Sequence, residues 1–172
     1  DRVAPVHLND FAFTADEIQL TALKEISVCD AQLNFLPAFI PRCTMIQSLS
    51  LNNNRFSELP EDICKCLTLL TELRLSHNNI LEIPDSISLL TDLRVLALTG
   101  NQLTYVNEVI AECCTLLEEL HVSNNQIQTL PINFSRCHET LKSLDLENNR
   151  MNKMPPVAVK LTQLTSLKLA GN

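Results

Sequence analysis

The chain has 172 residues, of which 45% are hydrophobic and 4% aromatic, and its formal net charge is −7. Its 13 Lys and Arg residues are scattered along the sequence, which argues against nucleic-acid binding because that affinity rests largely on neutralising phosphates. Every apolar run is far shorter than the roughly 18 residues that a membrane-spanning helix requires, so we expect no insertion into a membrane.

An eleven-residue pattern recurs along the chain at intervals of 23 or 24 residues. Six copies begin at Ile46, Leu70, Leu93, Leu117, Leu141 and Leu164. With the first residue of a copy counted as offset 0, apolar residues stand at offsets 0, 3, 5 and 10 and asparagine stands at offset 8. A regular period in this range indicates a stack of similar structural units.

Two weaker copies precede these six. The segment from Val3 keeps the hydrophobic spacing but has Phe11 at the asparagine position, and the segment from Leu23 has Ala31 there. We therefore predict about eight strands in a single domain over residues 1–172, with a degenerate first coil at 1–22 and regular repeats at 23–172. The last copy stops at offset 8, which predicts a C-terminal end without a cap.

Each repeat is predicted to form a short strand, a turn and a return segment. Residues such as those from Glu72 to Leu75 alternate inward and outward, and stacking pairs these strands into one parallel sheet. The asparagines at offset 8 can satisfy backbone groups of the turn. Proline then recurs in phase, which predicts short helical segments on the opposite side. These positions are Pro60, Pro84, Pro131 and Pro155, with Asn107 in place of proline in the Leu93 repeat.

The seven cysteines are interpreted mainly as buried thiols. Four lie on the return segment, at the site that Leu90 and Leu161 occupy in other repeats: Cys43, Cys66, Cys113 and Cys137. Their odd number, and the lack of the cysteine clusters that cap secreted repeat proteins, favour a reducing cytoplasm. Neither Cys64-Lys65-Cys66 nor Cys113-Cys114 has the CxxC spacing of zinc sites, so we expect no metal and no cofactor.

The full pattern, LxxLxLxxNxLxxLPxxI, resembles the intracellular leucine-rich repeats of the Ras-suppressor, Ras-scaffold and Scribble/Erbin type, over residues 23–172. The resemblance implies an α/β solenoid in the form of a right-handed horseshoe. Short parallel strands would line its concave face, and short helices or 3-10 turns its convex face. It also implies protein recognition along the concave sheet, usually within a scaffold or signalling protein.

Residues at offsets 2 and 4 are predicted to point outward on the concave face and so have no duty in the core. In the Leu93 repeat these positions and their neighbours Thr99 and Gly100 are uncharged, whereas charged residues, Glu118 among them, stand in the repeats on either side. A strip of small residues with a charged rim can accept a partner's side chain. We predict a partner-binding surface that comprises Glu72, Arg74, His77, Arg94, Val95, Ala97, Thr99, Glu119, His121, Asp145 and Lys168. The alternative is that these positions are polar only because solvent reaches them.

Catalysis is not expected. His121 and Asp145 fall on adjacent strands, within possible hydrogen-bonding reach, but no nucleophile accompanies them except Ser123, which lacks an oxyanion-binding glycine turn. The acidic residues near the starts of the helical segments are interpreted as helix-dipole partners and solubilising groups. They are Glu61, Asp62, Asp85, Glu108 and Glu112.

The sequence therefore predicts a cytoplasmic module that binds one or more protein partners. A second interpretation is a regulatory or sensor region of a larger signalling enzyme, such as a cyclase, kinase or phosphatase. A third is the ectodomain of a receptor or adhesion protein, with disulfides in unfamiliar places. Asn133-Phe134-Ser135 is a formal glycosylation sequon, although one such triplet is expected by chance.

Overall fold

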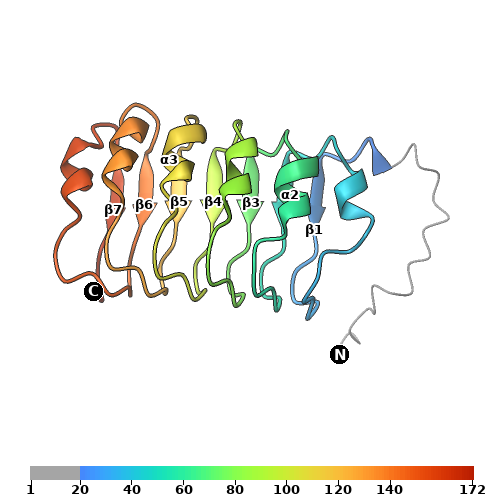
Figure 1. The fold of residues 1–172 in the computed structure, drawn as a ribbon, viewed down its shortest axis with the longest axis horizontal. Helices are drawn as coiled ribbons and strands as arrows, with labels where there is room; N and C mark the ends of the chain where they lie inside the picture. Colours follow the sequence, from blue (N-terminus) through green and yellow to red (C-terminus); the bar gives the residue numbers. More distant parts are fainter. Residues whose placement is uncertain (1–19) are drawn as a thin grey trace.

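The computed structural model describes residues 20–172, which form one stack of coils (Figure 1). Each coil contributes one strand of three residues to a single parallel sheet, in the order of the sequence. The strands are β1 (Glu25–Ser27), β2 (Ser48–Ser50), β3 (Glu72–Arg74), β4 (Val95–Ala97), β5 (Glu119–His121), β6 (Ser143–Asp145) and β7 (Ser166–Lys168). Neighbouring strands pair residues of equal offset, as Leu73 does with Leu96.

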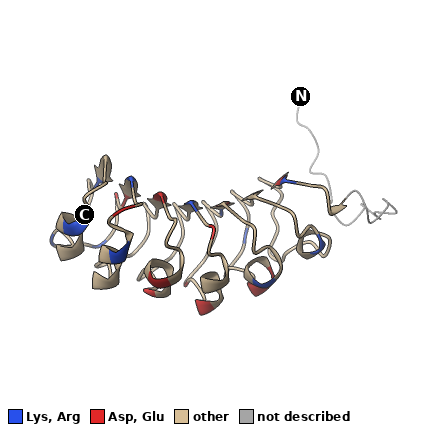
Figure 2. Cartoon of the chain, turned by 90° about the horizontal axis from the view of Figure 1, so that it is seen from above, with Lys and Arg blue, Asp and Glu red and all other residues tan. Residues whose placement is uncertain are grey.

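Helical segments line the other side of the stack, and the view from above shows the strands on the concave side and the helices on the convex side (Figure 2). Those with bounds inside the described residues are two short α-helices and four 3-10 helices, which carry the label η. They are η2 (Ile40–Arg42), α2 (Glu61–Cys66), η3 (Asp85–Leu89), α3 (Val109–Cys113), η4 (Ile132–Cys137) and η5 (Pro156–Lys160). The predicted α/β repeat solenoid is thus confirmed, with seven strands among the described residues. The eighth predicted strand, in the degenerate coil, lies outside them.

The core runs along the inside of the stack. In the five repeats that begin at Ile46, Leu70, Leu93, Leu117 and Leu141, the inward-facing residues at offsets 0, 3 and 5 are fully buried. No coil can enclose its own apolar residues, so each is buried against the coils before and after it, and stability is shared between neighbours. Burial of one such leucine contributes about 1.5–3 kcal/mol relative to its exposure.

The asparagines at offset 8 form a continuous ladder under the turns. The side chain of Asn78 accepts a hydrogen bond from the Phe56 amide (3.0 Å) and donates to the Leu51 and Leu75 carbonyls (3.1 and 3.0 Å). The same contacts recur along the stack, so that the Leu75 carbonyl also accepts from Asn101 (3.0 Å). Each asparagine therefore ties its own turn to the preceding coil, as the sequence predicted.

The residue at offset 7, which precedes an asparagine in every described coil except the first, adopts a left-handed backbone conformation that we had not predicted. The seven residues at offset 7 are Asp30, Asn53, His77, Gly100, Asn124, Asn148 and Gly171, and all have φ between 51° and 72°. Asparagine, aspartate, histidine and glycine are the residues that tolerate this region best. This explains why offset 7 is almost entirely Asn, Asp or Gly even though its side chains lie outside the core.

The prediction that Cys66 and Cys113 occupy the inward position of the return segment is wrong, because both are only half-buried. Leu67 and Cys114 take that position instead. In these two repeats the segment is an α-helix, and the amide of Cys114 donates to the Ile110 carbonyl four residues earlier (2.9 Å). A 3-10 turn would bring the third residue inward, whereas an α-turn brings the fourth. Cys43 and Cys137, which close 3-10 segments, are buried as predicted.

Candidate functional site

The concave surface is built from the outward-facing residues of the strands. Strand register places Ala97 between Arg74 and His121, and places Val95 between Glu72 and Glu119. The predicted uncharged strip on β4 is therefore flanked by charged residues of β3 and β5, as the repeat pattern indicated. On β3, β4 and β5 and the residues just after them, six residues of the predicted binding surface are partly exposed to solvent: Glu72, Arg74, Val95, Thr99, Glu119 and His121.

Each flanking strand pairs its own charges. The guanidinium of Arg74 forms an ion pair with the carboxylate of Glu72, two residues earlier on the same face. On the other side, Nε2 of His121 lies 2.9 Å from Oε2 of Glu119. Residues two apart on a strand point to the same side, which makes these pairs possible. The charged side chains of the walls therefore find partners within their own strands, as an ion pair on β3 and as an imidazole–carboxylate contact on β5.

The floor of the strip is more recessed than the sequence suggested. Ala97 is only 6% exposed, although it does not belong to the hydrophobic core cluster. Its partners on the neighbouring strands, Arg74 and His121, have longer side chains. A partner would contact Val95 and Thr99 first, and would reach Ala97 only with a protruding group.

A line of hydrogen bonds leads from this strip across the next two strands. The hydroxyls of Thr99 and Ser123 lie 3.1 Å apart, and Ser123 donates to Oδ2 of Asp145 (3.2 Å). The Ser123 hydroxyl has a single hydrogen, which it donates in the hydrogen bond to the carboxylate. The Thr99 hydroxyl must therefore be the donor in its hydrogen bond with Ser123. Nζ of Lys168 lies 3.8 Å from the same carboxylate oxygen. Asp145 is therefore held by Ser123 and Lys168, while the His121 ring contacts Glu119.

Ser123, which the sequence suggests only as a nucleophile, is a functional candidate for another reason. It is buried, with 4% of its surface exposed, and it connects Thr99 with Asp145. Ser123 stands at offset 6, where the residue type varies from repeat to repeat without a pattern. Its place between Thr99 and Asp145 is therefore revealed only by the geometry.

Arg94 and His77 lie at opposite ends of the strands and do not join the strip. Nη1 of Arg94 is 2.6 Å from Oε1 of Glu118, whose other oxygen is 2.5 Å from Nζ of Lys142. The hydrogen bonds from Lys142 and Arg94 lower the pKa of the Glu118 carboxyl. His77 is exposed at a left-handed turn position, and its ring covers Gly100, where an added Cβ would lie 2.6 Å from Nδ1. Arg94 therefore belongs to an ion-pair ladder along one edge, and His77 to the turn edge.

Among residues 20–172, no group of three or more His, Cys, Asp or Glu side chains is arranged to hold a metal ion. Within the same part of the chain, no helix has both the length and the apolar character needed to cross a bilayer.

Sequence comparison relates the chain to proteins with the same repeat. The family model described as "Leucine rich repeat" matches residues 44–103 and 115–172. Osteomodulin from Rattus norvegicus is 35% identical over 75 residues, which cover 43% of this chain and 17% of that protein. Lumican from Mus musculus is 35% identical over 75 residues, with coverage of 44% and 22%. The chain thus spans less than a quarter of the length of these relatives.

Two solved plant structures have a similar fold. One is the Arabidopsis receptor kinase HAESA in complex with the peptide hormone IDA and the co-receptor SERK1, with a TM-score of 0.74 and 28% identity over 86% of this chain and 26% of that one. The other is the ectodomain of the membrane receptor kinase GASSHO1/SCHENGEN3 from Arabidopsis thaliana, with a TM-score of 0.71 and 29% identity over 83% and 18%. These proteins support the repeat class without singling out the intracellular subgroup. With the family model matching well over half of its residues, the chain belongs to the leucine-rich repeat family.

Proposed function

We propose that the chain is a protein-binding module that holds a protein partner on its concave face, within a scaffold or signalling assembly. The observation that carries this proposal is the uncharged strip on β4 between two walls whose polar side chains contact each other within their own strands. A partner that covers Val95 and Thr99 would desolvate apolar and hydroxyl surface without separating an ion pair. Such a surface suits the buried centre of an interface, with the charged walls as its rim.

The comparisons support the same proposal. The HAESA solenoid, which is similar in fold, is in complex with a peptide hormone and a co-receptor. By analogy, the sheet of this chain would bind a peptide or protein segment. Fold analogy supplies no partner identity, and the chemistry of the strip favours a small apolar or hydroxyl-bearing side chain at the centre of the contact.

Substitution of Ala97 by arginine tests this proposal. The new guanidinium would stand between Arg74 and His121, would fill the recess and would add like charge. We expect affinity for the partner to fall by at least about tenfold, which is roughly 1.4 kcal/mol. The matched control is Ile132→Arg, which adds the same side chain at an exposed position of η4 on the convex side.

Proteins that co-purify with the tagged wild-type chain and both variants would be quantified by mass spectrometry, and one purified partner would be titrated by calorimetry. The proposal requires a partner that binds the wild type and Ile132→Arg but not Ala97→Arg. Unchanged capture by Ala97→Arg, with loss in Ile132→Arg, would move the site to the convex side. Circular dichroism and thermal unfolding would establish that both variants are folded.

We also propose a cytoplasmic location. Support comes from the seven cysteines, all of which are free thiols in the structure, with Cys43, Cys64, Cys114 and Cys137 buried. The rival location is extracellular, and it is favoured by the similarity to a receptor ectodomain. Counting thiols in the unfolded, unreduced protein separates the two: seven reactive thiols favour the cytoplasm, and one favours secretion with three disulfides.

We further propose that the chain acts by binding and not by catalysis. The buried hydroxyl of Ser123 donates a hydrogen bond to Asp145, while the ring of His121 contacts Glu119, so these residues do not form the Ser–His pair that usually activates a serine nucleophile. A role as the regulatory region of a larger signalling enzyme is compatible with this proposal. Sequencing the complete transcript would distinguish a separate scaffold from an appendage of a catalytic domain.

A further inference from the structure

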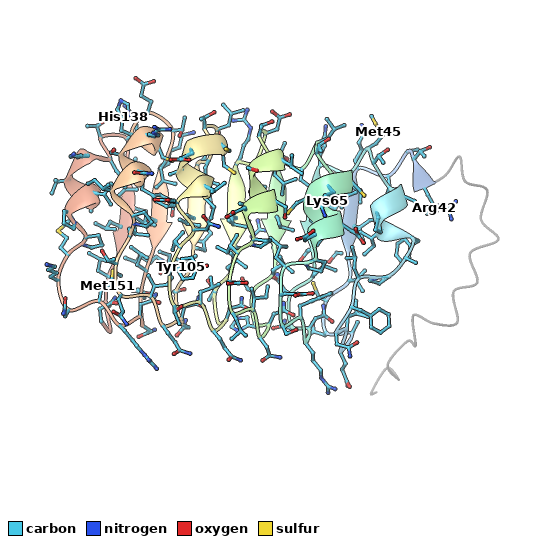
Figure 3. The ribbon with its side chains drawn as sticks, viewed as in Figure 1. Arg42, Met45, Lys65, Tyr105, His138 and Met151 are labelled. Carbon is cyan, nitrogen blue, oxygen red and sulfur yellow. The ribbon has the colours of Figure 1, made fainter. Side chains whose placement is uncertain are left out.

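A groove of about 390 Å³ lies where the chain runs from the sheet to the helices, and none of its lining residues belongs to the concave strip. Three successive coils line it, through Asp85, Tyr105, Val106, Asn107, Glu108, Thr129 and Pro131. Figure 3 marks Tyr105 in this part of the coil, below α3. The volume is within the roughly 300–1,000 Å³ range of ligand-binding pockets, which is room for one long side chain and its adjacent backbone.

The base of the groove is fixed by Asn107, the residue that replaces the recurrent proline. It is only 9% exposed, and its amide nitrogen donates to the Ile83 carbonyl (2.9 Å) and to Oδ1 of Asp85 (2.8 Å). Its side-chain oxygen accepts from the Val109 amide (3.0 Å). These bonds hold the Asp85 carboxylate in place and leave its second oxygen available. A proline at this position could make none of them.

The wall of the groove combines an aromatic ring with carboxylates. Tyr105 is 48% exposed, and its hydroxyl donates to Oε2 of Glu82 (3.4 Å). Partial burial and the neighbouring Glu82 raise the pKa of Tyr105, so the phenol stays neutral at physiological pH. Asp85 and Glu108 add two further negative charges to the lining. The ring and the carboxylates thus face one space.

No cation of the described chain compensates these charges. The ion pairs of residues 20–172 engage other carboxylates, and the nearest partners here are amides: Asn107 for Asp85, and Asn133 for Glu108 at 3.5 Å. Figure 2 shows acidic residues on the convex helices in the middle of the stack and basic residues on the last two. The groove therefore lies in a stretch of uncompensated negative potential.

We propose that this groove binds an arginine side chain presented by a protein partner, separately from the concave site. The guanidinium would lie against the ring of Tyr105, while Asp85 and Glu108 accept its N–H donors. Cation–π contact and charge-assisted hydrogen bonds both strengthen where a groove limits hydration. Arginine suits the site better than lysine because its planar fork can stack and form several hydrogen bonds at once. The module would then have two binding faces, as a scaffold requires.

The experiment uses a short glycine–serine peptide with one central arginine, and the same peptide with citrulline, which has nearly the same shape but no charge. Each is titrated into the isotope-labelled chain and followed by amide NMR shifts. We expect saturable shifts confined to the backbone around Tyr105 to Glu108 and to Asp85. Replacement by citrulline should weaken binding by about fivefold or more.

Variants assign the interaction to the groove. Tyr105→Ala and Glu108→Gln should each weaken arginine-peptide binding by about twofold to fivefold, whereas Tyr105→Phe should retain it. The matched control is Asp62→Asn, which removes the same charge at the exposed start of α2, outside the groove. The proposal is overturned if citrulline binds equally well, if Tyr105→Ala has no effect, or if Asp62→Asn weakens binding as much as Glu108→Gln.

Discussion

The asparagine ladder yields the sharpest prediction about stability. Replacing Asn78 by alanine removes the acceptor of the fully buried Phe56 amide. It also removes donors to the Leu51 and Leu75 carbonyls, but these keep Asn54 and Asn101 as donors, each at 3.0 Å. One orphaned amide costs about 1–3 kcal/mol, and two weakened carbonyls and the lost packing add less than that. We therefore expect the free energy of unfolding to fall by about 2–4 kcal/mol.

The neighbouring residue provides a matched control. Asn79 is exposed, and its side chain makes only a 3.5 Å contact with Gln102, so Asn79→Ala should change stability by less than about 0.5 kcal/mol. Both variants would be measured by urea unfolding followed by circular dichroism. Equal destabilisation of the two variants would refute the structural role assigned to the ladder.

A double variant tests whether the ladder is shared. In Asn78→Ala combined with Asn101→Ala, the Leu75 carbonyl loses both of its side-chain donors. The pair should therefore cost more than the sum of the single variants, by about 1 kcal/mol. Additive energies would show that each asparagine acts only within its own turn.

Three further predictions concern other parts of the stack. Gly100→Ala should destabilise the fold by about 1–2 kcal/mol because of the left-handed backbone, and should displace the His77 ring, which a shift of the His77 NMR signals would report. At pH 8, iodoacetamide should label half-buried Cys66 and Cys113 well before Cys114, because burial raises the pKa of the Cys114 thiol to about 12. Stability should also decline between pH 9 and about pH 12, since the unfolded chain ionises this thiol near its ordinary pKa of 9.0 and the folded chain does not. Urea unfolding at several pH values should show a flatter profile for Cys114→Ala.

The repeat sufficed to predict the sheet, its register and the ladder, because those features depend on residues that recur at every coil. Leu73 and Asn78 have the same neighbours as their counterparts in other repeats, so one physical argument covers all copies. The left-handed conformation at offset 7 is equally periodic. It could have been predicted from the sequence, because that position is Asn, Asp or Gly in every described coil except the one with His77.

The return segments were harder to predict because small changes in backbone geometry decide which residue faces inward. The repeats at Ile46 and Leu93 have an α-turn there, which in the Leu93 repeat buries Cys114 and exposes part of Cys113. The repeat at Leu117 has the same length but keeps a 3-10 segment, so repeat length does not decide the geometry. The repeat pattern also could not predict which side chains contact each other on the sheet. Register allowed His121 to meet Asp145, yet the imidazole contacts Glu119 on its own strand. Such choices depend on rotamers, which offsets do not specify.

The most direct test of the concave binding site is photo-crosslinking from single positions. Benzoylphenylalanine would be introduced at Val95 on β4 or at Ile132 on η4, and the crosslinked partner peptides would be identified by mass spectrometry. We expect a specific adduct from position 95 whose formation excess unlabelled chain suppresses, and no adduct with the same partner from position 132. An adduct of that partner from position 132 alone would contradict it.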